Sequence, residues 1–157
     1  MSPDPIHIRV AREGDADAIV SIVNEAYRAE AFFVAGDRIS RADVDTFVQA
    51  GSCFVAEADG AVVACVQVEV DDGRGYFGML AVRPDAQGRG IGRTLIAFAE
   101  ATVRQRGCVA MDIKVVNLRV DLIRFYASLG YTAGGTEPYV HRPVLQPCHF
   151  VLMTKAL

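Results

Sequence analysis

The residues from Met79 to Leu95, M-L-A-V-R-P-D-A-Q-G-R-G-I-G-R-T-L, join an apolar stretch, a glycine-containing loop and an amphipathic helical pattern. The loop has glycines at positions 88, 90 and 92. Such a loop can turn consecutive backbone N–H groups in one direction, at the positive end of a helix dipole. This segment therefore predicts a binding site for a phosphate group.

Three phosphate-binding patterns can be compared with this loop. A Walker A loop requires Lys followed by Ser or Thr after its second glycine, and the loop has no such pair. A dinucleotide-binding loop, G-x-G-x-x-G, that began at Gly88 would require a glycine where Arg93 stands. The third pattern, Q/R-x-x-G-x-G/A, is met by Gln87, Gly90 and Gly92. Glycines that only form a turn are the simpler alternative, but the strand before them and the helix behind them favour a binding site.

The string L-A-V-R-P-D-A-Q-G-R-G-I-G, residues 80–92, resembles the GNAT superfamily of N-acetyltransferases, in which the third pattern binds the pyrophosphate of coenzyme A. The resemblance implies that acetyl-CoA is the co-substrate and that Gln87 belongs to its binding motif. It further implies that the two phosphates are bound by the backbone N–H groups of Gly88, Arg89, Gly90, Ile91, Gly92 and Arg93. The side chains of Arg89 and Arg93 can add positive charge there, or they can be solvated surface residues.

The strand before the loop is also part of the resemblance. It implies a cofactor-binding stretch of Leu80, Ala81 and Val82, in which Leu80 and Val82 pair with the amides of the pantetheine arm. A backbone N–H near Leu80 is expected to stabilise the negative charge that develops on the thioester oxygen.

A second string, R-F-Y-A-S-L-G-Y at 124–131, resembles the family motif in which an aromatic helix precedes L-G-F or L-G-Y. The resemblance implies that Tyr126 is the general acid for the leaving thiolate, since a phenol with a pKa of about 10 stays protonated at neutral pH. Packing of Tyr126 beside Leu122 and Ile123 is the purely structural alternative. The family often has Asn where Arg119 stands here, and the nearby Asn117 is expected to contact the cofactor instead.

A general base is needed because an ammonium group must lose a proton before it can attack. The predicted central strand, residues 76–82, contains no carboxylate. Glu69, on the neighbouring strand and on one face with Gln67, is the leading candidate. The alternatives are a water chain to solvent and the loop residues Asp71, Asp72, Glu137, His141 and His149.

The acceptor side is predicted from residues 30–38, which lie where GNAT proteins border their acceptor pocket. Phe32 and Phe33 can form an apolar wall there or can be ordinary core residues. Glu25 or Glu30 can attract a cationic amine. The proline-containing loop 134–147 is expected to cover the other side of the pocket. The expected acceptor is a primary amine of a small molecule or a peptide.

The composition predicts one globular domain over residues 1–157, with 52% hydrophobic and 22% charged residues. A net charge of −3 gives no reason to expect a nucleic acid or a membrane as partner, and a homodimer is allowed. No apolar run approaches the roughly 20 residues of a membrane span. The N-terminal residues show no secretory signal, so we expect a cytoplasmic protein.

The four cysteines, at 53, 65, 108 and 148, have no zinc-ligand spacing, so we expect no metal site and buried, reduced thiols. A thiolate at Cys65 or Cys108 would be unfavourable in an apolar strand, which favours direct attack by the amine over an acyl-cysteine route.

The order of predicted elements is strand, two helices, three strands, helix, strand, helix and two strands. Strands are expected at 6–10, 53–58, 61–70, 74–82, 109–116, from 131, and at 150–154. Helices are expected after Asp15 and after Ser40, each of which is predicted to cap the N-terminus of its helix, and at 91–106 and 120–129. This order predicts an α/β (α+β mixed) fold: a single central, mostly antiparallel sheet of about 6–7 strands, with one parallel strand–helix–strand crossover and helices on both faces.

Two other classes of function fit parts of this pattern. A non-catalytic acyl-CoA-binding or sensory domain would keep the phosphate loop and show no turnover to lose when Tyr126 is changed to Phe. A nucleotide-binding regulator would bind ATP in preference to CoA.

Overall fold

Seven strands form one mixed sheet in the computed structural model, which describes residues 5–140 and 142–157. The strands in chain order are β1 (His7–Val10), β2 (Cys53–Ala58), β3 (Ala61–Asp71), β4 (Arg74–Val82), β5 (Ala110–Val116), β6 (Thr132–Pro138) and β7 (His149–Ala156). They lie in the order β1-β2-β3-β4-β5-β7-β6, and every neighbouring pair is antiparallel except β4 and β5. The predicted sheet with one parallel crossover is confirmed.

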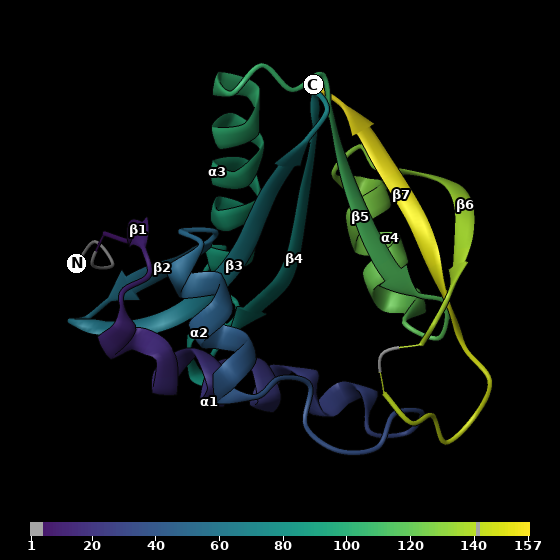
Figure 1. The fold of residues 1–157 in the computed structure, drawn as a ribbon, viewed down its shortest axis with the longest axis horizontal. Coiled ribbons are helices and arrows are strands. Elements are labelled where there is room, and N and C mark those ends of the chain that lie inside the picture. Colours follow the sequence, from purple (N-terminus) through teal and green to yellow (C-terminus); the bar gives the residue numbers. More distant parts are fainter. Residues whose placement is uncertain (1–4, 141) are drawn as a thin grey trace.

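The helices cover both faces of this sheet. They are α1 (Ala16–Ala26), α2 (Arg41–Gln49), α3 (Ile91–Gln105) and α4 (Val120–Ser128), with the short 3-10 turns η1 (Glu13–Asp15), η2 (Tyr27–Glu30) and η3 (Pro84–Ala86). Successive residues of a strand point to opposite faces. In β3, Cys65 packs in a core cluster with Ile19 of α1, whereas Ala64 and Val66 pack in a cluster with Leu95 of α3. The helices thus lie on both faces, as predicted, and the structure places α1 and α2 on one face and α3 and α4 on the other (Figure 1).

The two parallel strands are paired only at their beginnings. The register joins three Cα pairs: Arg74 with Ala110, Gly75 with Met111, and Tyr76 with Asp112. Beyond these pairs β4 and β5 diverge toward the end of the sheet near α1 (Figure 1). Within the described chain, the β5-facing edge of β4 from Phe77 to Val82 therefore has no neighbouring strand.

A β-bulge lies in this unpaired part of β4. On the β3 side, Gln67 faces Gly78 and Cys65 faces Ala81, so Met79 and Leu80 share the single partner Val66. Met79 has φ 51°, which is an uncommon conformation for a residue with a side chain. An extra residue in one strand disrupts the ladder locally and re-aims the backbone there. The bulge thus turns the Met79–Leu80 amides out of the regular ladder of the central strand.

Two local predictions about the elements are wrong. The loop predicted at 134–147 begins later, since β6 continues to Pro138 in antiparallel pairing with β7. The side chain of Asp15 does not cap α1; it accepts a hydrogen bond from the Arg12 N–H at 2.7 Å, inside η1. By contrast, Ser40 caps α2 as predicted, because its Oγ accepts from the N–H of Asp43 at 3.2 Å.

Candidate active site

The glycine loop presents backbone donors without acceptors in the chain. Gly88 and Gly90 have φ 81° and 76°, the left-handed region that glycine adopts without strain. The first N–H of α3 with a backbone acceptor is that of Thr94, which donates to the Gly90 carbonyl at 3.0 Å. In the described residues, the N–H groups from Gly88 to Arg93 have no acceptor in the chain. These six N–H groups, called the cradle below, form an anion-binding arrangement at a helix N-terminus.

Side chains of the same segment hold the cradle in place. The Gln87 amide nitrogen donates to the Val82 carbonyl at 3.2 Å, and the Ile91 side chain is fully buried below the loop. Arg89 forms a 3.3 Å ion pair with Asp59, so part of its charge is already neutralised. Arg93 lies over the ring of Phe125, 5.3 Å from its centroid. Gln87 therefore fixes the loop to the end of β4, and Arg93 places a cation between α3 and α4.

A cavity of about 790 Å³ lies where β4 and β5 diverge. Gln67 and Tyr27 line it on the face of the sheet covered by α1, and Leu122 and Tyr126 line it from α4 on the other face. The bulge residue Leu80 lies between these two groups. The cavity therefore connects the two faces of the sheet beside the displaced amides of β4.

Tyr126 both packs in the core and borders this cavity. Its ring makes edge contacts with Phe77, Phe125 and Tyr131, at centroid distances of 6.0, 5.3 and 5.9 Å. In the described part of the chain, its hydroxyl makes no hydrogen bond. Burial raises the pKa of the Tyr126 phenol above its usual value of 10.0. The hydroxyl is therefore a protonated donor at neutral pH, free to reach a group in the cavity.

Glu69 also lines the cavity, from the opposite face. It stands opposite Tyr76 in the β3–β4 register and accepts a hydrogen bond from the Gln67 amide at 2.7 Å. Its carboxylate is exposed to solvent, through which a proton can leave. The geometry permits the predicted role as base, and that role stays a prediction.

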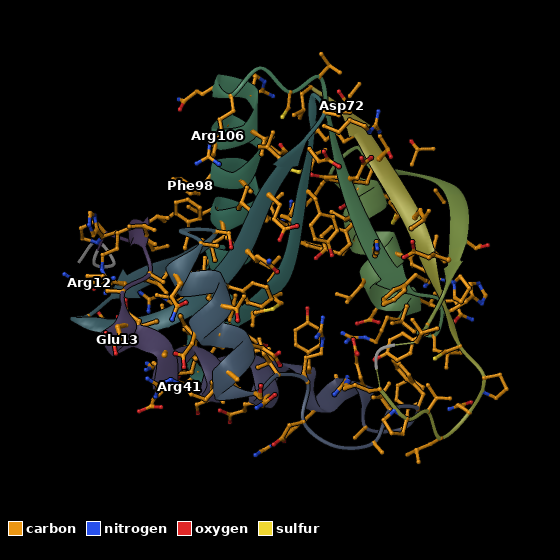
Figure 2. The ribbon with its side chains drawn as sticks, in the orientation of Figure 1. Arg12, Glu13, Arg41, Asp72, Phe98 and Arg106 are labelled. Carbon is orange, nitrogen blue, oxygen red and sulfur yellow. The ribbon has the colours of Figure 1, made fainter. Side chains whose placement is uncertain are left out.

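The other candidate bases lie elsewhere. Asp72 is in the β3–β4 turn, at the end of the sheet opposite α1 (Figure 2). Asp71 and Glu137 line a second hollow, of about 890 Å³, and Glu137 forms a 2.7 Å ion pair with Lys114. His149 begins β7 and does not line the 790 Å³ cavity. His141 lies outside the described residues.

Comparison with known proteins shows which family has this fold and this glycine loop. The sequence model of the Acetyltransferase (GNAT) family matches residues 16–131, from α1 through the cradle and the whole of α4. The chain belongs to the GNAT family.

Several known proteins resemble this GNAT chain. The mycothiol acetyltransferase of Propionibacterium freudenreichii subsp. shermanii is 26% identical over 142 residues, which are 86% of this chain and 46% of that protein. The chain spans about half the length of the curated relatives it matches.

Two solved structures share the fold. The ribosomal-protein-alanine N-acetyltransferase of Brucella melitensis has a TM-score of 0.79 and 22% identity, covering 96% of this chain and 99% of that one. A putative acetyltransferase of Salmonella typhimurium, solved with its cofactor acetyl-CoA, has a TM-score of 0.77 and 22% identity, covering 98% and 94%.

One feature of this GNAT chain was missed by sequence reasoning. Glu30 is 5% exposed and lines the cavity, where its carboxylate pairs with Arg119 at 3.2 Å and with Arg142 at 3.9 Å. Burial raises the pKa of Glu30, and the positive charges of Arg119, Arg38 and Arg142 oppose that rise. Glu30 was expected to attract a cationic amine, but its charge is already balanced by arginines. Arg119, which stands where the family often has Asn, was the sequence signal for this ion pair. Sequence reasoning could not identify Glu30 as its partner, because the two residues are 89 positions apart.

Asn117 has a structural contact in place of the expected cofactor contact. Its side-chain oxygen accepts from the N–H of His149 at 2.9 Å, and its own N–H donates to the His149 carbonyl at 2.9 Å. It does not line the 790 Å³ cavity. Asn117 thus fixes the end of β5 to β7, and its binding of a cofactor stays a prediction.

The expected apolar wall of the acceptor pocket is wrong. Phe33 is fully buried in a small core with Val34, Val116 and Phe150, as the alternative interpretation held. Phe32 is 54% exposed, and neither phenylalanine lines the cavity. Glu25 is exposed and also lies outside it.

The four cysteines are free, and three are buried as expected, whereas Cys148 is only partly buried. Burial raises the pKa of the Cys53 thiol to about 12 and also raises that of Cys65. Across the described residues, no group of three His, Cys, Asp or Glu side chains is arranged to hold a metal ion. None of the described helices is both long and apolar enough to cross a membrane.

Proposed function

We propose that this protein transfers an acetyl group from acetyl-CoA to a primary amine of a small molecule or peptide, by direct attack of the amine on the thioester carbonyl. The observation that carries the proposal is the position of the cradle, which follows the unpaired end of β4 beside a cavity open to both faces of the sheet. A domain that only bound coenzyme A through the loop would not need a cavity through which an acceptor can reach the end of β4.

The cradle fits a diphosphate because its donors are main-chain groups with no acceptor in the described chain, and because Gly90 and Gly92 carry no side chain to block a close approach. Acetyl-CoA would supply the acetyl group as an activated thioester. The free edge of Leu80, Ala81 and Val82 would hold the pantetheine amides in the manner of an added strand. The solved structure of the Salmonella relative with acetyl-CoA supports this assignment.

The residues of the cavity supply the remaining chemistry. The displaced N–H near Leu80 would stabilise negative charge developing on the carbonyl oxygen, which is effective in a site with little water. Tyr126 would donate its proton to the sulfur as the carbon–sulfur bond breaks and the carbon–nitrogen bond forms. Glu69, or water beside it, would accept the proton that the ammonium group loses before attack.

Two measurements test this function. Titration calorimetry should show that acetyl-CoA and CoA bind and that ATP does not compete with them. With a panel of amines, antibiotics and peptides, a thiol reagent should detect CoA release that depends on both substrates. Binding of acetyl-CoA without release from any amine would overturn catalysis and favour an acyl-CoA-binding domain. Absence of binding would overturn the whole assignment.

A further inference from the structure

Arg38 is a cation of the cavity that makes no ion pair with a carboxylate of the described residues. Its guanidinium lies over the ring of Tyr27, 5.4 Å from the centroid. Among residues 5–140 and 142–157 it makes no ion pair and no hydrogen bond. Tyr27 supplies no counter-charge, because burial raises the pKa of its phenol to about 12. A partly buried arginine usually has a charged or polar partner, so the donors of Arg38 are available to a ligand.

The acidic side chains that share the cavity do not take this role. Glu30 is paired with Arg119, Asp43 accepts from the Ser40 N–H at 3.0 Å, and Glu69 accepts from Gln67. Asp37 is exposed beside Arg38 and is not within ion-pair distance of it. The charge of Arg38 opposes the rise in the Glu30 pKa and adds to the lowering of the Asp43 pKa by the Ser40 hydrogen bonds, but no carboxylate accepts a hydrogen bond from its guanidinium.

The backbone on both sides of Arg38 is anchored. The Asn24 side chain donates to the Ile39 carbonyl at 3.0 Å and accepts from the Ile39 N–H at 2.9 Å. Arg142 donates to the Gly36 carbonyl at 3.2 Å. The backbone next to Arg38 is fixed by these hydrogen bonds, and its side chain stacks on Tyr27. The guanidinium is therefore preorganised to bind a planar, bidentate partner such as a carboxylate.

Two segments that are distant in sequence are joined to each other outside the lining of the cavity. Val34 pairs with Val144, the Ala35 N–H donates to the Pro143 carbonyl at 3.1 Å, and the Leu145 N–H donates to the Phe33 carbonyl at 2.7 Å. Figure 1 shows these two connections side by side below the divergent ends of β4 and β5. This junction holds the chain that leads to Arg38 against the chain that follows Arg142.

The position of Arg38 relative to the reaction centre is indicated by Tyr76. Arg38 and Tyr76 line the same cavity. In agreement, burial raises the pKa of Tyr76, and the charges of Lys114 and Arg38 oppose that rise. The Tyr76 hydroxyl lies against Gly78, where an added Cβ would meet it at 2.8 Å. Gly78 directly precedes the bulge, so Arg38 and the displaced amides border one space.

We propose that the acceptor is a free amino acid or a compound of that size, whose carboxylate is bound by Arg38 while its amine faces the bulge at Met79 and Leu80. This inference rests on the proposed acetyl transfer, since it names the acceptor class of the same site. A carboxylate would supply the partner that Arg38 lacks, and a free amino acid carries this carboxylate next to its amine, within the one space that Arg38 and the bulge border.

The test compares acids with their amides. The common L-amino acids and their α-carboxamides are assayed for CoA release with the wild type, Arg38→Gln and Arg28→Gln. Arg28 is an exposed arginine of η2 outside the cavity and serves as the matched control. For the preferred acid, kcat/KM should exceed that for its amide by about a hundredfold, because a site built for a charged partner is left unpaired by the analogue. Arg38→Gln should remove this preference, and Arg28→Gln should keep it.

Calorimetry with acetyl-CoA keeps the outcomes distinct. If Arg38→Gln binds acetyl-CoA like the wild type and loses turnover of the acid only, the proposal is supported. Amides turned over as well as acids, or a preference retained in Arg38→Gln, would overturn it. Release of CoA with peptides but with no free amino acid would also overturn it and would leave acetyl transfer standing. No acetyl-CoA binding at all would instead contradict the proposed function.

Discussion

Arg119 donates from Nη1 to the buried carboxylate of Glu30, 3.2 Å away and 89 residues earlier in the chain. Glu30 ends the turn η2 beside α1, and Arg119 directly precedes α4, which carries Tyr126. The pair therefore joins the acceptor side of the cavity to the helix of the proposed general acid. Both side chains are mostly buried, with 12% and 6% of their surfaces exposed.

Arg119→Gln should destabilise the protein by about 3 kcal/mol at neutral pH, because the buried carboxylate of Glu30 loses its shorter ion pair and keeps only the longer one, with Arg142 at 3.9 Å. Burial already raises the native pKa of Glu30, and loss of Arg119 raises it further. The native state then holds a proton more tightly than the unfolded chain. The variant should recover stability as the pH falls through the raised native pKa, with full recovery below 4.5, the usual pKa of this group.

Urea unfolding at several pH values checks this prediction. Arg41→Gln is the control, since Arg41 (Figure 2) pairs at the surface with Asp17 and Asp45. Its effect on the unfolding midpoint should be much smaller and nearly independent of pH. An Arg119→Gln variant as stable as the wild type at pH 8 would show that the pair does not hold the two segments together.

The Glu30–Arg119 pair also shows what sequence reasoning could not reach. The cradle, the cap of α2 and the hairpin of β2 and β3 are local, so their signals lie within a few residues. A contact over 89 residues depends on how the sheet closes, and no spacing rule names it. The extent of β6 was missed for the same reason, because Gly134, Gly135 and Pro138 favour a loop locally and β7 supplies the ladder that overrides them.

Gly92→Ala and Gly90→Ala should differ, although both glycines belong to the cradle. Gly92 has an ordinary backbone conformation, and an added Cβ would lie 3.9 Å from its nearest neighbour, Val82 Cγ2. The fold should therefore tolerate alanine, with a change in Tm of a few degrees at most. Affinity for acetyl-CoA should stay within a few-fold of the wild type, because the pattern Q/R-x-x-G-x-G/A accepts alanine at this position (~1.4 kcal/mol would be a factor of ten).

Calorimetry and thermal unfolding of three variants check this. Gly90→Ala should lose both affinity and stability, by about 1 kcal/mol, because Gly90 has φ 76°. Gly14→Ala should change neither, since Gly14 lies in open space with no positive φ. Acetyl-CoA affinity retained in Gly90→Ala would contradict binding of the diphosphate by the cradle.

The environment of Asp15 allows a prediction of how the unfolding free energy changes at low pH. A hydrogen bond from Arg9 and one from the Arg12 N–H hold its pKa below the usual 3.8, against the effect of burial. The unfolded chain therefore binds a proton more readily than the native state. The contribution of this pair is fully present above the unfolded pKa and is lost as the pH falls through the lowered native pKa. Unfolding free energy should decline more steeply below about pH 5 in the wild type than in Asp15→Asn. Asp17→Asn, changed at a 90% exposed side chain, should keep the wild-type slope.

Tyr126→Phe and Tyr131→Phe remove hydroxyls from two neighbouring rings and should have opposite effects. The Tyr126 hydroxyl has no partner in the described chain, so its loss should leave Tm and acetyl-CoA affinity nearly unchanged and lower kcat by about a hundredfold. The Tyr131 hydroxyl donates to Glu100 at 2.8 Å, so its loss should cost about 2 kcal/mol of stability and leave kcat within a few-fold. Because burial raises the pKa of Tyr126 above 10.0, kcat should also show no fall from its ionisation up to pH 10.0. Equal kcat in Tyr126→Phe and the wild type would contradict the role of Tyr126 as general acid and leave it only a role in packing.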